Sequence, residues 1–320
     1  MNLSDKKIYI AGAGGMVGGA VKRNLEAKGC HNLIYKSSTE LDLVNQSAVE
    51  TFFSETKPEI VILSAAKVGG ILANNIYRAD FIYQNLMIEA NIINAAFQNN
   101  VEKLVFLGSS CIYPKFAAQP IREEELLAGF LEYTNEPYAV AKIAGIKLCE
   151  SYFRQHGCNF LSVMPTNLYG DYDNFDLQNS HVIPALIRKF HEAKTDESGK
   201  VVLWGSGTPF REFLYVEDLA EAVVFLTENV NAKTVYEQEI SHVNIGTGED
   251  VTIGELALLI KRIVGFKGEI EFDTSKPDGT PRKLLNVSRI NELGWTARTT
   301  LEDGLRKTYQ WFLENKADRP

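Results

Sequence analysis

The sequence predicts an α/β protein with a doubly wound parallel sheet, followed by a smaller C-terminal α/β domain. Two features of the first half of the chain support this class. Short apolar runs suited to buried parallel strands alternate with longer amphipathic segments, and a glycine-rich loop follows the first run directly. Beyond about residue 165 the alternation ends. We therefore expect residues 1–165 to form the first domain, residues 166–320 to form mainly the second, and elements near 211–247 to return to the first.

Composition limits the function classes. The chain is 45% hydrophobic and 23% charged, which is ordinary for a globular protein. Its net charge of −8 argues against a general binder of nucleic acids or anionic membranes. No apolar run is long enough to span a bilayer, and the N-terminus leads into a predicted strand without a signal-peptide core.

The cysteine pattern argues against a metal site. Cys30, Cys111, Cys149 and Cys158 form no C-x-x-C pair and have no histidine cluster beside them, so zinc is not expected. We expect a reduced, cytoplasmic protein with no metal, no nucleic-acid partner and no membrane association.

The first predicted strand, residues 7–11, runs into the glycine-rich loop, and an amphipathic helix follows over 20–28. Glycines at this spacing allow the sharp turn and the close approach of a pyrophosphate to the helix N-terminus. A Rossmann-type dinucleotide site is therefore predicted. The residues assigned to the loop are Gly12, Ala13, Gly14, Gly15, Met16, Val17 and Gly18.

The second predicted strand, residues 32–36, ends without the acidic residue that would select NAD. Lys36, Ser37 and Ser38 supply a cation and hydroxyls that suit a 2′-phosphate, so NADP(H) is the expected cofactor. A solvated strand end is the other interpretation of Lys36. Asp42 is expected either at the adenine edge or near a helix N-cap.

The third predicted strand, residues 60–63, is followed by small residues, among them Ala65 and Ala66, against which a ring or ribose can lie. A long helix is predicted over 73–99. Its apolar residues occupy more than one face, which suggests burial on a second surface and a homodimer.

The fourth predicted strand, residues 103–107, ends in hydroxyls and a thiol at the sheet edge where ligands bind. The residues expected to line the cofactor there are Leu107, Gly108, Ser109 and Ser110. In the next helix, predicted over 138–156, Tyr138 and Lys142 are four apart and share one face. An ammonium near a phenol favours the phenolate, so Tyr138 would become a better proton donor.

A fifth strand is predicted over 160–164, and a short loop follows it. The loop residues expected to contact the cofactor are Pro165, Thr166, Asn167 and Leu168. The later predicted strands are 201–204, 212–215, 242–245 and 269–272, and the later predicted helices are 181–193, 216–228, 253–264 and 301–314.

Together these motifs resemble the extended short-chain dehydrogenase/reductases. The glycine loop, the serine after the fourth strand and Tyr138-x-x-x-Lys142 carry the general resemblance, and Arg211-Glu-Phe-Leu-Tyr-Val-Glu-Asp218 is similar to the nucleotide-sugar branch. More narrowly, Ala65-Ala-Lys-Val-Gly-Gly-Ile71, Gly108-Ser-Ser-Cys-Ile-Tyr-Pro114 and Asp278-Gly-Thr-Pro-Arg-Lys283 are similar to the GDP-4-keto-6-deoxy-mannose 3,5-epimerase-4-reductases. One departure is Gly14, where several members carry an arginine that helps hold the 2′-phosphate.

The resemblance implies a bifunctional reaction on a GDP-sugar with a C4 ketone. Cys111 would act as base and His181 as acid in inverting C3 and C5, and Ser109 would support the enolate oxygen. Tyr138 would donate a proton during reduction of C4 by NADPH, and Lys142 would contact the nicotinamide ribose. His181 is also counted among the cofactor contacts. The implied substrate-side residues, in addition to Ser109 and Cys111, are Asn167, Lys189, Trp204, Arg211 and Asp278.

Alternative functions remain open for this sequence. A nucleotide-sugar 4-epimerase needs neither Cys111 nor His181, and a 4,6-dehydratase would have an acid/base carboxylate pair where this chain has Cys111-Ile112-Tyr113. A non-catalytic dinucleotide-binding module of the same fold commonly loses the tyrosine and lysine that are kept here.

Overall fold

The computed structural model describes residues 1–177, 180–276 and 278–316, and its largest element is a six-stranded sheet. The strands lie in the order β2-β1-β3-β4-β5-β9, and every neighbouring pair is parallel. Their bounds are β1 (Ile8–Ala11), β2 (Leu33–Ile34), β3 (Ile60–Leu63), β4 (Lys103–Leu107), β5 (Phe160–Pro165) and β9 (Val243–Ile245). The predicted fold class is confirmed.

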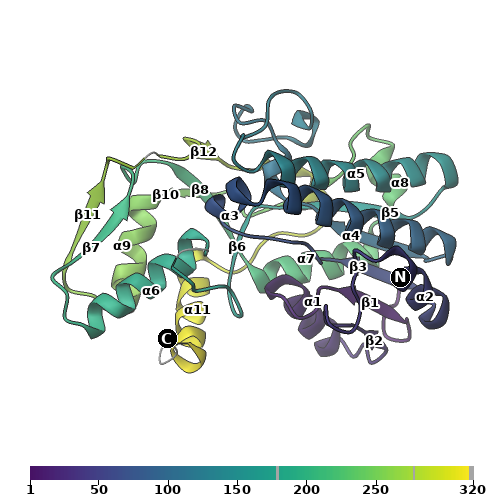
Figure 1. The fold of residues 1–320 in the computed structure, drawn as a ribbon, viewed down its shortest axis with the longest axis horizontal. Helices are drawn as coiled ribbons and strands as arrows, with labels where there is room; N and C mark the ends of the chain where they lie inside the picture. The colour runs from purple at the N-terminus through teal and green to yellow at the C-terminus, as the bar shows by residue number, and fades with distance from the viewer. Residues whose placement is uncertain (178–179, 277, 317–320) are drawn as a thin grey trace.

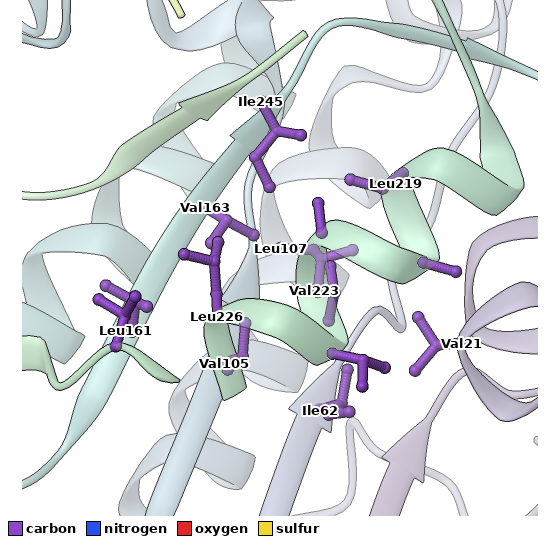
Figure 2. Close-up of a cluster of buried hydrophobic side chains, with 14 of the residues drawn as sticks. Val21, Ile62, Val105, Leu107, Leu161, Val163, Leu219, Val223, Leu226 and Ile245 are labelled. Carbon is purple, nitrogen blue, oxygen red and sulfur yellow. The ribbon is translucent and has the colours of Figure 1, made fainter. Parts of the chain in front are cut away.

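Helices cover both faces of this sheet (Figure 1). One face carries α1 (Met16–Ala27) and α7 (Val216–Asn229), and the other carries α2 (Gln46–Thr56), α4 (Arg78–Gln98) and α5 (Glu136–His156). Figure 2 shows the first face, where Val21 of α1 and Val223 of α7 pack over Ile62 and Val105 of the sheet. Because both faces are buried, the strands are continuous apolar runs. Both α7 and β9 come from the second half of the chain.

The direction of strand order reverses next to β1. The chain passes from β1 to β2 on one side and returns to β3 on the other. Parallel sheets bind ligands in the crevice at the carboxyl ends of the strands, at such a reversal. The fold therefore makes the loops after β1, β3 and β4 the place to look for a site.

The rest of the chain forms a smaller α/β unit, at the left in Figure 1. Its strands are β6 (Asn167–Tyr169), β8 (Phe210–Tyr215), β10 (Asp250–Thr252) and β12 (Arg282–Lys283) in one sheet, and β7 (Lys200–Trp204) and β11 (Glu269–Asp273) in another. Its main helices are α6 (Val182–Thr195), α9 (Ile253–Val264) and α11 (Leu301–Asn315). They enclose a separate apolar core that includes Phe190, Leu256 and Leu305. Residues 178–179, 277 and 317–320 of the predicted second domain lie outside the described residues.

The prediction of one helix over 73–99 is wrong. The structure has α3 (Ile71–Ile76) and α4, because the backbone of Tyr77 leaves the helical region (φ −98°, ψ 43°). No proline or glycine marks this break. Contacts from elsewhere fix the start of α4: Arg78 donates 2.7 Å to the Tyr133 carbonyl and lies 3.4 Å from the Glu136 carboxylate.

Several elements were not predicted from the sequence, and the second strand is shorter than expected. The additional elements are α2, β6, β10, β12, α3, α8 (Ala232–Tyr236), α10 (Ser288–Glu292) and the 3₁₀ turns η1 (Ser110–Ile112) and η2 (Glu123–Glu125). The three additional strands form only by pairing with a distant segment, as β12 pairs with β8. Among the helices the structure describes, none has the length and apolar character needed to cross a bilayer.

Candidate active site

The glycine loop packs closely against the end of β3. Gly12 has φ +89°, and a Cβ there would lie 2.8 Å from the Ala65 nitrogen; a Cβ on Gly18 would lie 2.2 Å from the Gly12 carbonyl oxygen. Only glycine fits these two positions. Gly15 occupies the N-cap of α1 without a side chain, so the first-turn N–H groups face an open loop suited to a pyrophosphate. Gly14 has nothing within 4 Å of an added Cβ.

The end of β2 is arranged differently from the sequence prediction. The Lys36 ammonium lies 3.2 Å from one carboxylate oxygen of Glu40, while the Ser37 N–H and hydroxyl donate to the other at 2.8 and 2.7 Å. These hydrogen bonds from Ser37 and Lys36 lower the pKa of Glu40 to about 2. Two of the groups assigned to a 2′-phosphate are thus engaged by a carboxylate that the sequence analysis did not consider. Asp42 is not the N-cap of α2; that residue is Asn45.

The loop after β3 is clamped by a buried amide. Asn85 on α4 accepts from the Lys67 N–H at 2.9 Å and donates to the Lys67 carbonyl at 3.1 Å. Ala65 and Ala66 are therefore held at the carboxyl edge beside the glycine loop. Small side chains leave the edge accessible for a flat group.

Lys142 is deeply buried at the end of β4. Its ammonium donates to the Leu107 carbonyl at 3.1 Å and lies 3.0 Å from a carboxylate oxygen of Glu89, and the two side chains are 2% and 1% exposed. It also lies 4.7 Å from the centre of the Phe106 ring and 5.8 Å from that of Tyr138. The tyrosine–lysine pair predicted from spacing is thus joined to a carboxylate from α4.

Tyr138 lies among the groups that follow β4. Its phenol hydrogen-bonds with the Ser109 hydroxyl, and its ring meets Phe81 edge-on at 6.4 Å. Burial raises the pKa of Tyr138 well above 10, Cys111 and Glu89 raise it further, and the Ser109 hydrogen bond opposes them. The lowered pKa expected from Lys142 alone is wrong, because burial dominates. Tyr138 therefore remains a protonated donor at neutral pH.

Cys111 lies in the η1 turn, two residues after Ser109, and its side chain is buried. Burial raises the pKa of its thiol above 9.0, while Lys283, a hydrogen bond from Ser109, and Lys142 act in the opposite direction. Lys283 enters through β12, which pairs with β8 so that Lys283 stands opposite Arg211. The sequence analysis missed this cation, since only the pairing of distant strands brings it to Cys111.

A buried network fixes the η1 turn. Tyr113, at the end of the turn, hydrogen-bonds to His242 Nε2 at 2.6 Å and donates to the Asn244 side chain. The Asn244 N–H in turn donates to the Glu123 carboxylate at 3.1 Å. Burial lowers the pKa of His242 to about 3, so it stays neutral. The network ties Cys111's turn to β9.

His181 lies at the N-cap of α6, where it makes no side-chain capping bond. The surrounding protein lowers the pKa of its imidazole below 6.5 although the residue is exposed by area. Among the described residues, no hydrogen bond or ion pair joins it to the Ser109–Tyr138 cluster. His181 belongs to the smaller unit, because it lies at the start of α6.

The predicted substrate-side residues lie in the smaller unit. The Lys189 ammonium is 6.0 Å from the centre of the Trp204 ring, which is 71% exposed. Arg211 lies on β8, and its side chain approaches Gly279. Asp278 is engaged by Ser206, whose N–H and hydroxyl donate to it at 2.9 and 2.7 Å. This bond holds the 278–279 loop next to Arg211.

The remaining predicted cofactor residues follow the sheet edge. The Gly108 N–H donates to the Val163 carbonyl at 2.9 Å, and Ser110 is buried in η1. Pro165 ends β5, and Thr166 donates its N–H to the Ile245 carbonyl at 3.0 Å. The Asn167 amide donates to the Glu212 carbonyl at 2.8 Å, and Leu168 follows it in β6. These contacts hold the β5–β6 connection against β8 and β9.

In the described part of the chain, no group of three or more His, Cys, Asp or Glu side chains could hold a metal ion. All four cysteines are free. The site is therefore an arrangement of acids, bases and hydrogen-bond donors around a dinucleotide loop.

Comparison with known proteins identifies the family. The model of the NAD dependent epimerase/dehydratase family matches residues 8–246. The chain belongs to this family. As a member, it uses a nicotinamide cofactor. Its glycine loop has the close packing that a dinucleotide-binding loop needs.

Similar members of the NAD dependent epimerase/dehydratase family share its full length. A GDP-L-fucose synthase of Escherichia coli (strain K12) is 58% identical over 98% of this chain and 98% of its own. GDP-L-fucose synthase 1 of Arabidopsis thaliana is 56% identical over 99% and 97%. A solved GDP-D-glycero-L-gluco-heptose synthase of Campylobacter jejuni, in the presence of NADPH, is 42% identical over 98% and 100%, with a TM-score of 0.93. The resemblance stated from the motifs is confirmed.

Glu89 is another residue that the sequence analysis missed. A signal was present, because Glu89 continues the buried stripe of Phe81 and Asn85 at a spacing of four residues. A carboxylate on an apolar helix face needs a partner, but the sequence does not say which residue supplies it.

Proposed function

We propose that the chain is a GDP-L-fucose synthase, which epimerises C3 and C5 of GDP-4-keto-6-deoxy-D-mannose and reduces C4 to give GDP-L-fucose. The observation that carries the proposal is the cluster of Ser109, Cys111, Tyr138 and Lys142 at the end of β4, in a chain 58% identical to a GDP-L-fucose synthase. The cluster combines a base, a proton donor and a hydroxyl around one pocket edge.

Epimerisation needs a base and an acid on opposite faces of the sugar. The C4 carbonyl acidifies the protons on C3 and C5. Cys111 removes each proton as a thiolate, and His181, on α6, returns one from the other side. Ser109 stabilises the enolate oxygen that forms at C4. Lys283 favours the thiolate because its positive charge lowers the pKa of Cys111.

Reduction uses the same pocket. NADPH, when bound, would supply the hydride for C4. Tyr138 gives its proton to the C4 oxygen, and Ser109 holds that oxygen in place. Lys142 is fixed by its hydrogen bond to the Leu107 carbonyl and would contact the nicotinamide ribose. Its positive charge favours proton transfer from Tyr138.

The GDP portion is assigned to the smaller unit. Arg211 provides bidentate contacts to the diphosphate, and Lys189 adds a second cation. Trp204 offers an exposed ring for stacking, Asn167 holds the substrate loop, and Asp278 supports the loop beside Arg211.

The finer expectations complete the proposal. NADP(H) is the cofactor. Lys36, Ser37 and Ser38 bind its 2′-phosphate once Glu40 has released Lys36 and Ser37. The enzyme is a homodimer in the cytoplasm, and the outer face of α4, where Tyr83 is 59% exposed, supplies apolar surface for the second subunit.

The test offers purified enzyme GDP-4-keto-6-deoxy-D-mannose and NADPH. We expect NADPH oxidation and a product with the L-fucose configuration. In deuterated water, Cys111→Ser should slow exchange at C3 and C5 more than it weakens NADPH binding, while Cys158→Ser, in a thiol far from the pocket edge, serves as control. Absence of turnover together with activity on UDP-glucose would contradict the proposal and indicate a 4-epimerase.

A further inference from the structure

Glu89 is a carboxylate in the middle of α4, at the packed contact between α4 and α5. It is 1% exposed, and its partner Lys142 is 2% exposed. A carboxylate in such a position loses its hydration, so it is tolerated only where a charged partner compensates. The 3.0 Å ion pair with Lys142 supplies that partner.

Lys142 is held on more than one side. Glu89 contacts the ammonium from α4, and the Leu107 carbonyl accepts from it at 3.1 Å at the end of β4. The Phe106 ring lies 4.7 Å away. These contacts leave the ammonium little freedom, and they point it to the strand end where the nicotinamide ribose would lie.

Gly145 shows that α5 is shaped around the carboxylate. A Cβ at this position would lie 2.8 Å from Glu89 Oε2 and 2.5 Å from the Phe106 ring. Glycine weakens a helix interior, so its presence in the middle of α5 calls for a packing reason. The close approach of Glu89 and Phe106 is such a reason, and it is independent of the ion pair itself.

We propose that Glu89 is a positioning residue of the reductive site: it is the counter-ion that holds Lys142 fixed beside Tyr138 and the nicotinamide ribose. The inference rests on the proposed function, because it assigns Glu89 a role in the reduction step. It adds Glu89 of α4 to the tyrosine–lysine motif, whose two residues both lie on α5.

The charges around Glu89 give the pair a definite pH dependence. Lys142, Tyr138 and Cys149 face it from α5, and Cys111 of η1 stands beside Tyr138. Burial raises the pKa of Glu89 to about 7, with Lys142 opposing, and Glu89 raises the pKa of Tyr138. Cys149, with a pKa of about 12, stays neutral.

Replacing the Glu89 carboxylate with an uncharged group should lower the pH at which Tyr138 loses its proton. A buried ammonium without a counter-ion loses its proton more easily, and a phenol without a nearby anion does so too. Without Glu89, Tyr138 should therefore lose its proton at lower pH. The effect grows above pH 7, where Glu89 is ionised in the native protein.

The experiment compares Glu89→Gln with wild type and with Glu150→Gln, a partly exposed carboxylate of α5 that pairs with Lys147. We expect the alkaline limb of the kcat profile for keto-sugar reduction to move down by about one pH unit, a tenfold change in the protonation equilibrium. KM for the sugar should change less than about twofold, since the ion pair does not touch it. Glu150→Gln should follow wild type.

A second variant guards against a folding defect. Glu89→Asp keeps the charge but shortens the side chain, so it should lower kcat while leaving the alkaline limb unchanged. A profile for Glu89→Gln parallel to wild type, with only a lower melting temperature, would overturn the proposal and leave Glu89 a structural residue.

One measurement separates this inference from the proposed function. Phenolate absorbance, taken as the difference between each protein and its Tyr138→Phe form, titrates Tyr138 without any sugar. A shift of that titration to lower pH in Glu89→Gln supports the positioning role even if the keto-sugar is not turned over. An unshifted titration contradicts the positioning role whatever the substrate.

Discussion

The carboxyl ends of β4 and β2 differ in how the protein holds the charged groups there. At the end of β4, Lys142 and Glu89 are nearly inaccessible and each contacts groups from several elements. At the end of β2, Lys36 and Glu40 are exposed and contact mainly each other and Ser37. The first region is set by the interior of the protein, and the second by a local turn.

This difference separates two tasks. Proton transfer needs donor and acceptor held in fixed positions, and a buried, multiply bonded cluster provides that rigidity. Recognition of the far end of a cofactor tolerates rearrangement, because exposed ion pairs are weak and screened by salt. Substitutions at the end of β4 should therefore change the reaction rate strongly. Substitutions at the end of β2 should change the preference for NADPH over NADH only mildly.

The largest effect is expected for Tyr138→Phe. Loss of a positioned proton donor should slow C4 reduction by about 10²- to 10⁴-fold, while NADPH binding and exchange at C3 and C5 persist. Single-turnover kinetics with the keto-sugar would measure it, with the exposed Tyr83→Phe as control. Reduction at the wild-type rate would show that Tyr138 does not donate the proton, and it would contradict the proposed difference between the two regions.

An intermediate effect is expected for Lys283→Met. Its cation lowers the pKa of Cys111, so its removal should move the rise of C3 and C5 exchange to higher pH. Below the pKa of the Cys111 thiol, the thiolate is the minor form, so exchange at C3 and C5 becomes faster as the pH rises. At neutral pH we expect exchange about tenfold slower, recovering in alkali, because one pKa unit is a tenfold change. Lys267→Met, on the exposed surface, should behave as wild type; a uniform loss at every pH would mean that Lys283 acts on binding instead.

The smallest effect is expected for Glu40→Gln at the exposed end. The amide is a weaker acceptor for Lys36 and Ser37, so these groups become available to a 2′-phosphate. The NADPH-to-NADH ratio of kcat/KM should rise by about threefold to tenfold and decline with salt, as expected for a screened charge. Glu55→Gln is the matched control, because Glu55 lines the same surface pocket as Lys36 and Glu40. A ratio that falls would show that Glu40 helps bind the phosphate-bearing cofactor.

The sequence predicted most of the large sheet for a simple reason. Strands buried on both faces must be continuous apolar runs, and Ile60–Leu63 and Lys103–Leu107 were located in this way. The glycine loop was equally visible, because only glycine fits at Gly12 and Gly18. The short strands of the smaller unit were missed in part, since two-residue β12 has no pattern of its own and depends on β8.

The sequence by itself determined the parallel sheet, the glycine loop and the residues whose chemical type suits proton transfer, because strand burial, glycine geometry and helix spacing are local properties. Only the tertiary structure decided which charges face each other. It brings Glu89 next to Lys142 and Lys283 next to Cys111. Electrostatic effects depend on distance and on burial, and neither is set until distant segments pack together.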